Sequence, residues 1–495
     1  MKTLASLLRW RALRHPDLPA TWFQGRIRTF GGLDATSSEL ASGLVERLDL
    51  KPGDRVAILD KNTDAYVELL FALAKAGAVA VMVNWRLTPR EVAEIVEDAA
   101  PVAVVAGDEY AAATSGLTCR SLGFAELPRS SGDPHRDDPE QVAWQLYTSG
   151  TTGLPKGAML THRNLFDSQA AAAFEFPELR EGGRGLVAMP LYHIGGSGWL
   201  HFVLGSGACA VMVREVVPPE LLQVMVDQRV ETGFLVPAVL LFLTQLPQSA
   251  NSDFSALKSI IYGASPISPD LLDRSMQVFG CRFTQVYGLT ETTGAITALQ
   301  HEHHNGERLL SCGRAMFGAE MGIVDPLGEP LPDGEIGEIV YRGGNLMAGY
   351  WGRPEDTAAA IRDGWFHTGD AGVVDSAGFF YIRDRIKDMI VSGGENIYPA
   401  ELEGVLAGHP DVADVAVIGV PDDRWGETVK AIVVRRPGSE LGADGLIEWS
   451  REHLAGFKQP RSVDFVETIP RNPTGKILKR ELREAYWPAD ARQVH

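Results

Sequence analysis

Hydrophobic positions between residues 54 and 106 alternate between short continuous runs and longer segments with helical spacing. The continuous runs at 55–59, 78–83 and 102–106 have the length and β-branched content of buried strands. The segments at 64–76 and 89–99 have helical spacing; Gly77 ends the first, and Thr88 with Pro89 begins the second. Strands that alternate with helices predict a parallel sheet covered by helices.

The same alternation returns after a polar, proline-containing loop at 128–140. We expect a helix capped by Thr161 that runs to about residue 174, and strands at 186–189, 234–236, 259–262 and 283–287. The first of these strands leads into a glycine-rich loop at 190–198 (PLYHIGGSG). Open α/β sheets bind ligands in such loops, at the carboxyl ends of their strands.

The pattern changes twice in the second half of the chain. Short β-runs with PLG and PDG turns between residues 318 and 341 predict a small antiparallel sheet or barrel. After a charged, hinge-like run at 383–387, we expect a helix at 399–406, strands at 415–420 and 429–434, a helix at 446–454 and a strand at 463–466. The fold class is therefore α/β. A large N-terminal domain (1–386, with a β-barrel-like subdomain at about 310–383) precedes a small mobile α+β domain at 387–495.

Composition narrows the function classes without selecting one. The chain has 495 residues, with 46 basic and 64 acidic side chains and a net charge of −18, which argues against non-specific nucleic-acid binding. Four scattered cysteines indicate neither a disulfide framework nor a zinc site, and a reducing cytoplasm is the expected location. Composition leaves open whether the protein forms a homo-oligomer.

The first sixteen residues are predicted to form a solvated amphipathic helix. Arginines at positions 9, 11 and 14 interrupt a short Leu/Trp pattern, and no apolar region of a signal peptide follows. No run of 18 apolar residues exists, so we expect no transmembrane segment. Peripheral membrane contact of this helix is the alternative, and nothing in the pattern supports it.

The segment 147–157 (YTSGTTGLPKG) carries the strongest chemical signal. Glycine N–H groups approach a ligand closely and form anion-binding nests, hydroxyls add donors, and one lysine adds a point charge suited to polyphosphate. The segment does not match the G-x-x-x-x-G-K-[ST] phosphate loop, so its design differs. We predict that it binds phosphates through Thr148, Ser149, Gly150, Thr151, Thr152, Gly153 and Lys156.

The segment closely resembles the signature of the adenylate-forming (ANL) superfamily, which includes acyl-CoA synthetases, luciferase-type enzymes and the adenylation domains of peptide synthetases. Further motifs follow in the superfamily's order: YGLTE at 287–291, WFHTGD at 365–370, DRIKDMIVSGGENIYP at 384–399 and PRNPTGK at 470–476. The resemblance spans about residues 30–480, and the C-terminal half is most similar to bacterial fatty-acyl-CoA synthetases.

The resemblance implies a nucleotide site. Glu291 would be the Mg²⁺ ligand, a role that suits a single carboxylate beside phosphate oxygens. Asp370 and Arg385 would contact the ribose, and Lys476 would pair with the reacting carboxylate and α-phosphate. The nucleotide's base and phosphate would also contact Gly263, Ala264, Ser265, Tyr287, Gly288 and Thr290.

The resemblance also implies an acyl pocket and a coenzyme A path. His193 would position or gate the acid beside an apolar wall made of Tyr192, Ile194, Trp199, Phe202, Val236, Pro237, Gly294 and Ile296. No Lys or Arg among these residues would pair with a second carboxylate. Lys387 matches the hinge position, and Gly393 and Gly394 would let the pantetheine arm pass. Trp425, Phe457 and Lys458 would meet the coenzyme's nucleotide end.

The expected activity is an AMP-forming acid–thiol ligase that uses ATP, Mg²⁺ and coenzyme A. A carboxylic acid, expected to be a fatty or other apolar monoacid, would form an acyl-adenylate that coenzyme A then cleaves. An enzyme that loads a separate carrier protein, acts on an aromatic acid or oxidises its adenylate would share every motif. A non-catalytic nucleotide-binding protein is the alternative from another class. It would be expected to lack one of Lys156, Glu291, Asp370 or Lys476, all of which are present.

Overall fold

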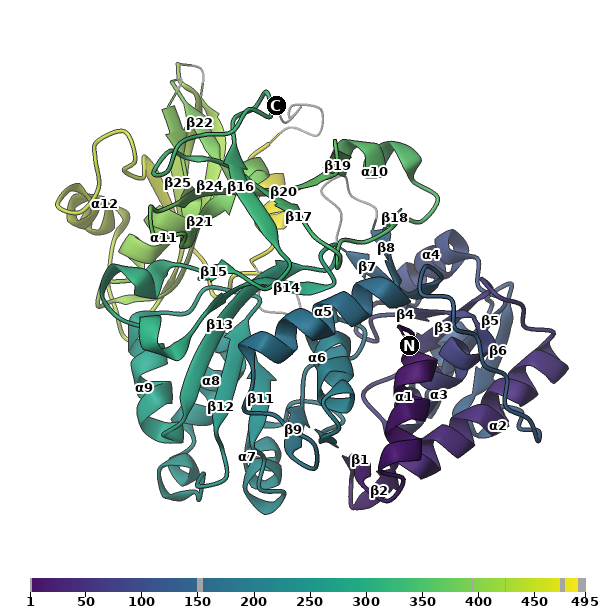
Figure 1. The fold of residues 1–495 in the computed structure, drawn as a ribbon. Coiled ribbons are helices and arrows are strands. Elements are labelled where there is room, and N and C mark those ends of the chain that lie inside the picture. The colour runs from purple at the N-terminus through teal and green to yellow at the C-terminus, as the bar shows by residue number, and fades with distance from the viewer. Residues whose placement is uncertain (1, 149–154, 394, 423, 472–476, 488–495) are drawn as a thin grey trace. The chain divides into compact units, whose positions relative to one another are not determined.

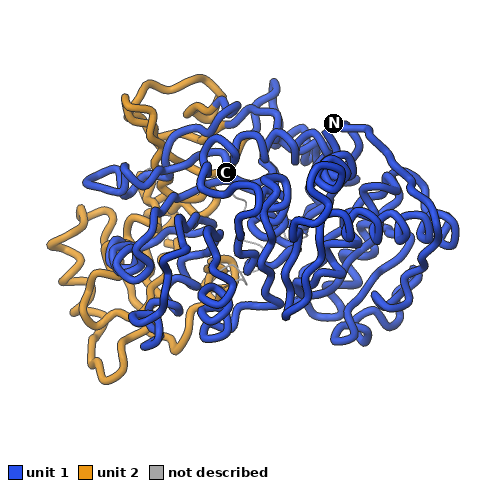
Figure 2. Tube along the Cα trace, turned by 60° about the horizontal axis from the view of Figure 1, so that its bottom comes forward, with its two compact units in different colours: residues 1–320, 341–366 blue, residues 321–340, 367–495 orange. Residues whose placement is uncertain are grey.

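The computed structural model describes residues 2–148, 155–393, 395–422, 424–471 and 477–487. The chain forms two compact units, which Figure 2 shows in different colours: residues 1–320 with 341–366, and residues 321–340 with 367–495. The predicted 386/387 boundary lies within the second unit and stays a prediction about which part of the chain moves.

Two mixed sheets form the framework of the first unit (Figure 1). One runs in the order β15 (Arg314–Ala315), β14 (Gly294–Leu299), β13 (Arg282–Leu289), β12 (Ser259–Gly263), β11 (Thr232–Leu235), β9 (Arg184–Val187), β10 (Cys209–Met212), β1 (Pro19–Phe23) and β2 (Arg26–Thr29). The other runs β18 (Gly349–Tyr350), β8 (Lys156–Thr161), β7 (Val142–Thr148), β4 (Val79–Met82), β3 (Arg55–Leu59), β5 (Ala103–Ala106) and β6 (Arg120–Gly123). The central strands pair in parallel, as the alternating pattern predicts.

Helices cover these sheets. They are α1 (Leu4–Arg14), α2 (Phe30–Leu48), α3 (Asp64–Ala76), α4 (Pro89–Ala99), α5 (His162–Glu175), α6 (Ile194–Gly205), α7 (Pro218–Asp227), α8 (Pro237–Gln245), α9 (Pro269–Phe279) and α10 (Pro354–Ala360). Helix α5 contacts β8 of one sheet and β14 of the other, so it lies between the two sheets. None of the helices in the described residues is long and apolar enough to cross a membrane.

Local capping explains why several helices begin and end where the sequence predicts. Thr88 and Glu91 form a capping box at the start of α4, and Thr161 caps α5 by accepting from the backbone N–H of Asn164. Gly77 ends α3 in the left-handed conformation with φ +76°, where glycine carries no steric penalty.

Three local predictions are wrong. The strand predicted at 186–189 is β9 at 184–187, and the loop predicted at 190–198 ends at His193, where α6 begins. Helix α1 is not simply solvated, because Leu4, Leu7 and Leu8 on one of its faces are buried. The packing of α1 against α2 and α3 provides that burial, and periodicity alone does not reveal it.

The second unit contains shorter, mainly antiparallel strands. These are β16 (Glu320–Val324), β17 (Gly337–Arg342), β20 (Trp365–Val374) and β21 (Phe380–Arg385). The short strand β19 (Ile361–Arg362) belongs to the first unit and pairs with residues 365 and 366. A further sheet has the order β23 (Glu395–Ile397), β22 (Ile390–Ser392), β25 (Gly426–Arg435) and β24 (Val412–Asp422), with β26 (Ser462–Phe465) parallel to β25. Its helices are α11 (Pro399–Leu406), α12 (Ala443–Arg451) and α13 (Lys479–Glu484).

One prediction about this unit needs correction. Residues 383–385 of the charged run belong to β21, and only 386–388 form a short 3₁₀ turn, η6 (Ile386–Asp388). Asp370 lies inside the ten-residue strand β20, where it pairs with Arg385 of β21.

Candidate active site

The phosphate-binding segment connects two strands of a hairpin in the first unit. Strands β7 and β8 pair antiparallel, with Tyr147 opposite Gly157 and Thr148 opposite Lys156. Ser149, Gly150, Thr151, Thr152 and Gly153 lie outside the described residues. The hairpin therefore places Thr148 and Lys156 on either side of the point where the predicted loop leaves the sheet.

Lys156 contacts two side chains that lie about two hundred residues further along the chain. Its Nζ is 2.5 Å from Oδ1 of Asp356 on α10 and 5.4 Å from the ring centre of Tyr350 on β18. Strand β18 pairs with β8, with Tyr350 opposite Ala158, and this pairing brings the ring to the lysine. The Lys156 side chain is only 14% exposed, so its charge lies in a largely enclosed setting.

Glu291 lies in the tight turn between β13 and β14 and is 9% exposed. The Tyr350 hydroxyl donates to its Oε1 at 2.8 Å, and the backbone N–H of Met347 donates to its carbonyl at 2.8 Å. The segment after β17 thus holds both the side chain and the backbone of the predicted metal ligand.

Buried hydrogen bonds fix the shape of the Glu291 turn. Thr292 Oγ1 accepts from Leu289 N–H at 3.0 Å and donates to the Gly294 carbonyl at 2.7 Å. Thr293 Oγ1 donates to the Asn345 carbonyl, and Asn345 Nδ2 donates to the Thr292 carbonyl. Because these buried groups are satisfied by one another, the turn is rigid in the sense that moving it breaks several bonds.

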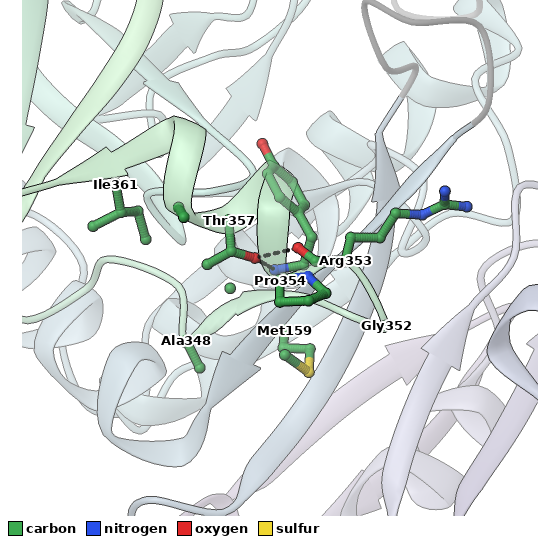
Figure 3. Close-up of a pocket in the computed structure, with 10 residues that line it drawn as sticks. Met159, Ala348, Gly352, Arg353, Pro354, Thr357 and Ile361 are labelled. Atoms are coloured by element: carbon green, nitrogen blue, oxygen red, sulfur yellow. Dashed lines mark hydrogen bonds between the residues drawn. The ribbon is translucent and has the colours of Figure 1, made fainter.

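An open pocket of about 560 Å³ lies beside Tyr350 (Figure 3). Thr357 at its wall donates to the Arg353 carbonyl and accepts from Tyr350 N–H, both at 2.9 Å. Arg353 also donates to Asp98, which accepts a 2.6 Å hydrogen bond from the Tyr147 hydroxyl. Burial, reinforced by Asp98, raises the pKa of Tyr147, so this phenol stays a neutral donor at the start of the phosphate segment.

The predicted adenine wall forms at the ends of two neighbouring strands. Gly263 pairs with Val286, and a Cβ at Gly263 would lie 2.3 Å from the Val286 carbonyl oxygen. Ala264 has φ +70°, a left-handed conformation that alanine rarely adopts. Ser265 follows at this strand end; Gly288 and Thr290 flank the end of β13, on which Tyr287 lies. The structure therefore brings these predicted residues to one edge of the sheet, and their role in base binding stays a prediction.

His193 is the N-cap of α6. Its Nδ1 accepts from Gly195 N–H at 3.1 Å, which assigns the proton of a neutral ring to Nε2. A Cβ at Gly196 would lie 2.1 Å from the Pro190 carbonyl oxygen, so the glycines here are required by the close approach of the preceding loop. The sequence did not predict that His193 caps α6.

The predicted acyl wall is brought together in part. Ile194 Cγ1 would lie 3.8 Å from a Cβ at Gly294, so these two residues are neighbours, and Val236 and Pro237 begin α8 at the end of β11. Trp199, Phe202 and Phe176 pack against one another, with ring-centre distances of 5.3–6.3 Å between the three pairs. Ile296, on β14, is buried.

The predicted acyl wall is not purely apolar, because two of its residues make polar contacts. Trp199 Nε1 donates to the Leu186 carbonyl at 2.7 Å, and Arg86 donates to the Tyr192 hydroxyl at 2.7 Å. Burial raises the pKa of Tyr192, so its phenol is neutral. Arg86 was missed because it lies over one hundred residues before Tyr192, in a different strand-end loop.

In the second unit, Asp370 and Arg385 lie opposite each other on β20 and β21. Arg385 Nε is 2.7 Å from Asp370 Oδ1, and Thr368 Oγ1 accepts from Asp370 N–H at 3.1 Å. Asp370 is buried, with 3% of its surface exposed. The structure thus pairs the two residues that the sequence assigned to the ribose.

Lys387 lies in η6, and burial lowers its pKa. Residues before and after it contact the same helix, α13. Lys479 Nζ is 3.8 Å from Asp384 Oδ2, and Arg483 donates to Asp388 Oδ1 at 2.9 Å. Asp384 also accepts from Ala400 N–H at the start of α11.

Gly393 packs against Trp425. The Gly393 N–H donates to the Trp425 carbonyl at 2.8 Å, and a Cβ at Gly393, which has φ +61°, would lie 2.6 Å from the indole. Gly393 and Trp425, both predicted to contact coenzyme A, are therefore neighbours. The indole of Trp425 leaves no room for a side chain at position 393, which explains the glycine. Lys458 pairs with Glu401 at 2.7 Å beside the exposed ring of Phe457. Gly394 and Lys476 lie outside the described residues.

The donor set suits a magnesium ion that arrives with a nucleotide. Glu291 supplies one buried carboxylate, and no group of three or more His, Cys, Asp or Glu side chains within the described ranges could hold a metal ion. Mg²⁺ is commonly bound by one or two carboxylates together with substrate phosphates and water. Glu291 beside the phosphate hairpin fits that mode.

Tyr350 and Asp356 are the functional candidates that the sequence reasoning missed. Neither belongs to the quoted motifs, and Asp356 lies 200 positions from Lys156. A tyrosine and an acidic residue in a Gly- and Pro-containing stretch carry no chemical signal until β18 is seen to pair with β8.

Residues 8–351 match the family described as AMP-binding enzyme, and residues 401–476 match the family described as AMP-binding enzyme C-terminal domain. The chain is 40% identical to the fatty acid–[acyl-carrier-protein] ligase ScoC of Streptomyces coeruleorubidus, over 100% of this chain and 98% of the relative. It is also 40% identical to a feruloyl-CoA synthase of an Amycolatopsis species, with 96% and 97% of the two chains covered.

One solved structure is similar to this chain in both sequence and fold. It is the o-succinylbenzoate coenzyme A synthetase MenE of Bacillus subtilis in complex with ATP and a magnesium ion, with 30% identity, a TM-score of 0.88, and 96% of this chain and 98% of that chain covered. The matched families, together with relatives similar over nearly their whole length, show that this chain belongs to the AMP-binding enzymes of the adenylate-forming superfamily and is an AMP-forming acyl-CoA ligase.

Proposed function

We propose that the protein joins an apolar monocarboxylic acid to coenzyme A in two half-reactions at the expense of ATP. The observation that carries the proposal is the grouping of Lys156 and Glu291 around Tyr350. A cation beside the phosphate hairpin and a carboxylate one side chain away supply the two kinds of group that MgATP requires.

In the first half-reaction, a carboxylate oxygen of the acid attacks the α-phosphorus of ATP. A new P–O bond forms, the bond to the β-phosphate oxygen breaks, and pyrophosphate leaves with the electron pair. Thr148 and Lys156, with the segment between them, would hold the phosphates, and Glu291 would hold Mg²⁺. Bound Mg²⁺ would neutralise charge on the phosphate oxygens. Lys476 would stabilise the negative charge that develops where the acid meets the α-phosphate.

The remaining nucleotide contacts follow the sequence assignments. Asp370 accepts well from ribose hydroxyls because a carboxylate has several lone pairs, and Arg385 holds one of its oxygens in place. Gly263, Ala264, Ser265 and Gly288 would lie near a flat base beside Tyr287. Gly263 and Gly288 are required by the backbone itself, because a Cβ would lie 2.3 Å from the Val286 carbonyl oxygen and 1.9 Å from the Gly294 carbonyl oxygen.

In the second half-reaction, the thiolate of coenzyme A attacks the acyl carbon. A C–S bond forms, the C–O bond to the phosphate breaks, and AMP leaves. We assign the pantetheine path to the Gly393–Gly394 face and the rotation between half-reactions to Lys387. Trp425, Phe457 and Lys458 would meet the nucleotide end of coenzyme A. The ion pair of Lys458 with Glu401 lies at the surface and is weak enough for a phosphate to displace.

The acid would lie along Ile194, Gly294, Val236 and Pro237, with His193 at its carboxylate. These residues are mainly apolar, which supports a fatty, alicyclic or aromatic acid. The acids in the names of two relatives, ferulic acid and fatty acids, belong to that class.

The second candidate is an enzyme that transfers the same acyl group to a carrier protein. It is favoured by one specific observation: the relative aligned over the whole of this chain carries the name of an acyl-carrier-protein ligase. The two candidates share the first half-reaction and differ only in the thiol.

The test is pyrophosphate release across a panel of fatty, alicyclic, aromatic and dicarboxylic acids, with no thiol, with coenzyme A or with a phosphopantetheinylated carrier protein. We expect release with apolar monoacids and thioester with coenzyme A. Thioester with the carrier alone would select the second candidate, and no release with any acid would exclude both. A Lys476→Ala variant should lose most adenylation and still form thioester from premade acyl-adenylate.

A further inference from the structure

We propose that Tyr350 is a positioning residue that holds the magnesium carboxylate and the phosphate lysine apart and in fixed register. The inference rests on the proposed function, because it takes Glu291 and Lys156 as groups that serve MgATP. It adds a residue to that site and assigns a separate task to each part of its side chain.

The phenol hydroxyl of Tyr350 acts on Glu291. It donates to Oε1 at 2.8 Å, and the acceptor is an almost fully buried side chain. A hydrogen bond to a charged, buried acceptor is directional and stronger than one between neutral groups. It therefore fixes the rotation of the carboxylate and leaves its other oxygen to be aimed at a metal.

The ring of Tyr350 acts on Lys156. The ammonium lies 5.4 Å from the ring centre, within the range in which the negative face of an aromatic ring attracts a cation. Asp356 binds the same ammonium at 2.5 Å, so the lysine is held by a ring and by a carboxylate. A hydroxyl that donates to a carboxylate makes its ring richer in electrons, which couples the two contacts.

The spacing has a chemical purpose. A lysine and a glutamate this close to one aromatic ring carry opposite charges and attract each other. If they paired directly, the carboxylate would be lost to the metal. Tyr350 gives Glu291 a neutral partner and so leaves its carboxylate for the metal, while the ammonium is paired with Asp356, which the phosphates would displace.

The backbone supports this placement. Tyr350 lies opposite Ala158 in the β18–β8 pair, and its N–H is bound by Thr357 Oγ1 at 2.9 Å. The Trp351 N–H donates to the Gly157 carbonyl at 2.8 Å, directly after Lys156. The tyrosine is thus anchored to the strand that carries the lysine, and its hydroxyl extends to the turn that carries Glu291.

The test separates the two parts of the side chain. Tyr350→Phe removes the hydroxyl and keeps the ring, whereas Tyr350→Leu removes both. Pyrophosphate release is measured against free Mg²⁺ at saturating ATP, and against MgATP at saturating Mg²⁺. Tyr350→Phe should raise the half-saturating Mg²⁺ by about tenfold, the worth of a charged hydrogen bond, with less than about a twofold change in the KM for MgATP. Tyr350→Leu should in addition raise that KM by about three- to tenfold.

Two further variants keep the inference falsifiable. In a Glu291→Gln background, Tyr350→Phe should have no additional effect on the Mg²⁺ requirement, because the carboxylate that the hydroxyl orients toward the metal is already gone. Tyr381→Phe loses a comparable phenol–carboxylate hydrogen bond, to Asp375, and should leave both parameters unchanged.

Binding of MgATP, measured without turnover by calorimetry, separates failure of this inference from failure of the proposed function. Wild-type protein that binds MgATP but releases no pyrophosphate would refute the proposed function, while the Tyr350 variants could still be ranked by the Mg²⁺ dependence of nucleotide binding in the calorimeter. An unchanged Mg²⁺ requirement in Tyr350→Phe would overturn the inference. Equal effects of Phe and Leu on both parameters would also overturn it, because they would indicate a structural role alone.

Discussion

Asp370 and Arg385 form an ion pair across two neighbouring strands, with Arg385 Nε 2.7 Å from Asp370 Oδ1. The carboxylate is buried, and the guanidinium supplies it with a partner of opposite charge. A buried, oriented carboxylate is suited to accept hydrogen bonds from neighbouring hydroxyl groups.

The first prediction concerns this pair. Asp370→Asn should raise the KM for ATP by about tenfold, because an amide replaces a charged acceptor worth about 1.5–3 kcal/mol. Wild-type enzyme should also prefer ATP over 2′-deoxy- and 3′-deoxy-ATP, and the variant should lose most of that preference. Steady-state pyrophosphate release with the three nucleotides measures both effects. Asp333→Asn, at an exposed turn, is the control, and an undiminished preference for ATP in the variant would refute the ribose assignment.

The second prediction concerns the Lys156–Asp356 ion pair. Asp356 competes with phosphate for the ammonium, so Asp356→Asn should lower the KM for MgATP by about threefold, the worth of a partly exposed ion pair. Lys156→Gln should instead raise that KM by about tenfold or more, through loss of a charged contact to phosphate. Glu355→Gln, an exposed neighbour on α10, is the matched control. A higher KM in Asp356→Asn would show that the carboxylate orients the lysine rather than competing for it.

The third prediction separates the capping role of His193 from its role toward the acid. His193→Ala should lower the free energy of unfolding by about 1 kcal/mol, because α6 loses its N-cap. His193→Asn should restore that stability, because asparagine is a good N-cap residue. If His193 contacts the acid, both variants should raise the KM for the acid by about three- to tenfold, the worth of one hydrogen bond. If His193→Asn restored both the stability and the wild-type KM for the acid, His193 would act only as the N-cap of α6.

The fourth prediction concerns pH and two buried histidines. Burial lowers the pKa of His162 and of His201 to about 4, below the ordinary value of 6.5. The unfolded chain therefore binds more protons than the folded chain between pH 6.5 and 4, and stability falls as the pH falls through that window. Between pH 6.5 and pH 5, each histidine should lower the free energy of unfolding by about 2 kcal/mol, at about 1.36 kcal/mol per pH unit.

Thermal unfolding at pH 7 and pH 5 tests this effect. His201→Gln keeps a donor for the Leu165 carbonyl but cannot titrate, so its melting temperature should fall less on acidification than that of the wild type. His453→Gln removes an exposed histidine and should behave like the wild type. Identical acid sensitivity in His201→Gln and the wild type would contradict the prediction.

The sequence by itself determined the features that depend on neighbouring residues. Helices α3, α4 and α11 begin and end at the predicted residues because caps, prolines and periodicity act within a few positions. The hydroxyl-, glycine- and lysine-containing segment indicated polyphosphate for the same reason. The motifs and the resemblance assigned Asp370 and Arg385 to the ribose, and their ion pair is a finding of the structure.

Only the tertiary structure decided the contacts between distant parts of the chain. Asp356 reaches Lys156 across 200 positions and Tyr350 reaches Glu291 across 59, because β18 pairs with β8. The start of α6 at His193 depends in the same way on the folded loop, since the Pro190 carbonyl lies where a Cβ of Gly196 would be. Such contacts arise from strand pairing and close packing, which no local pattern of residues encodes, and they determine how the site's charges are held.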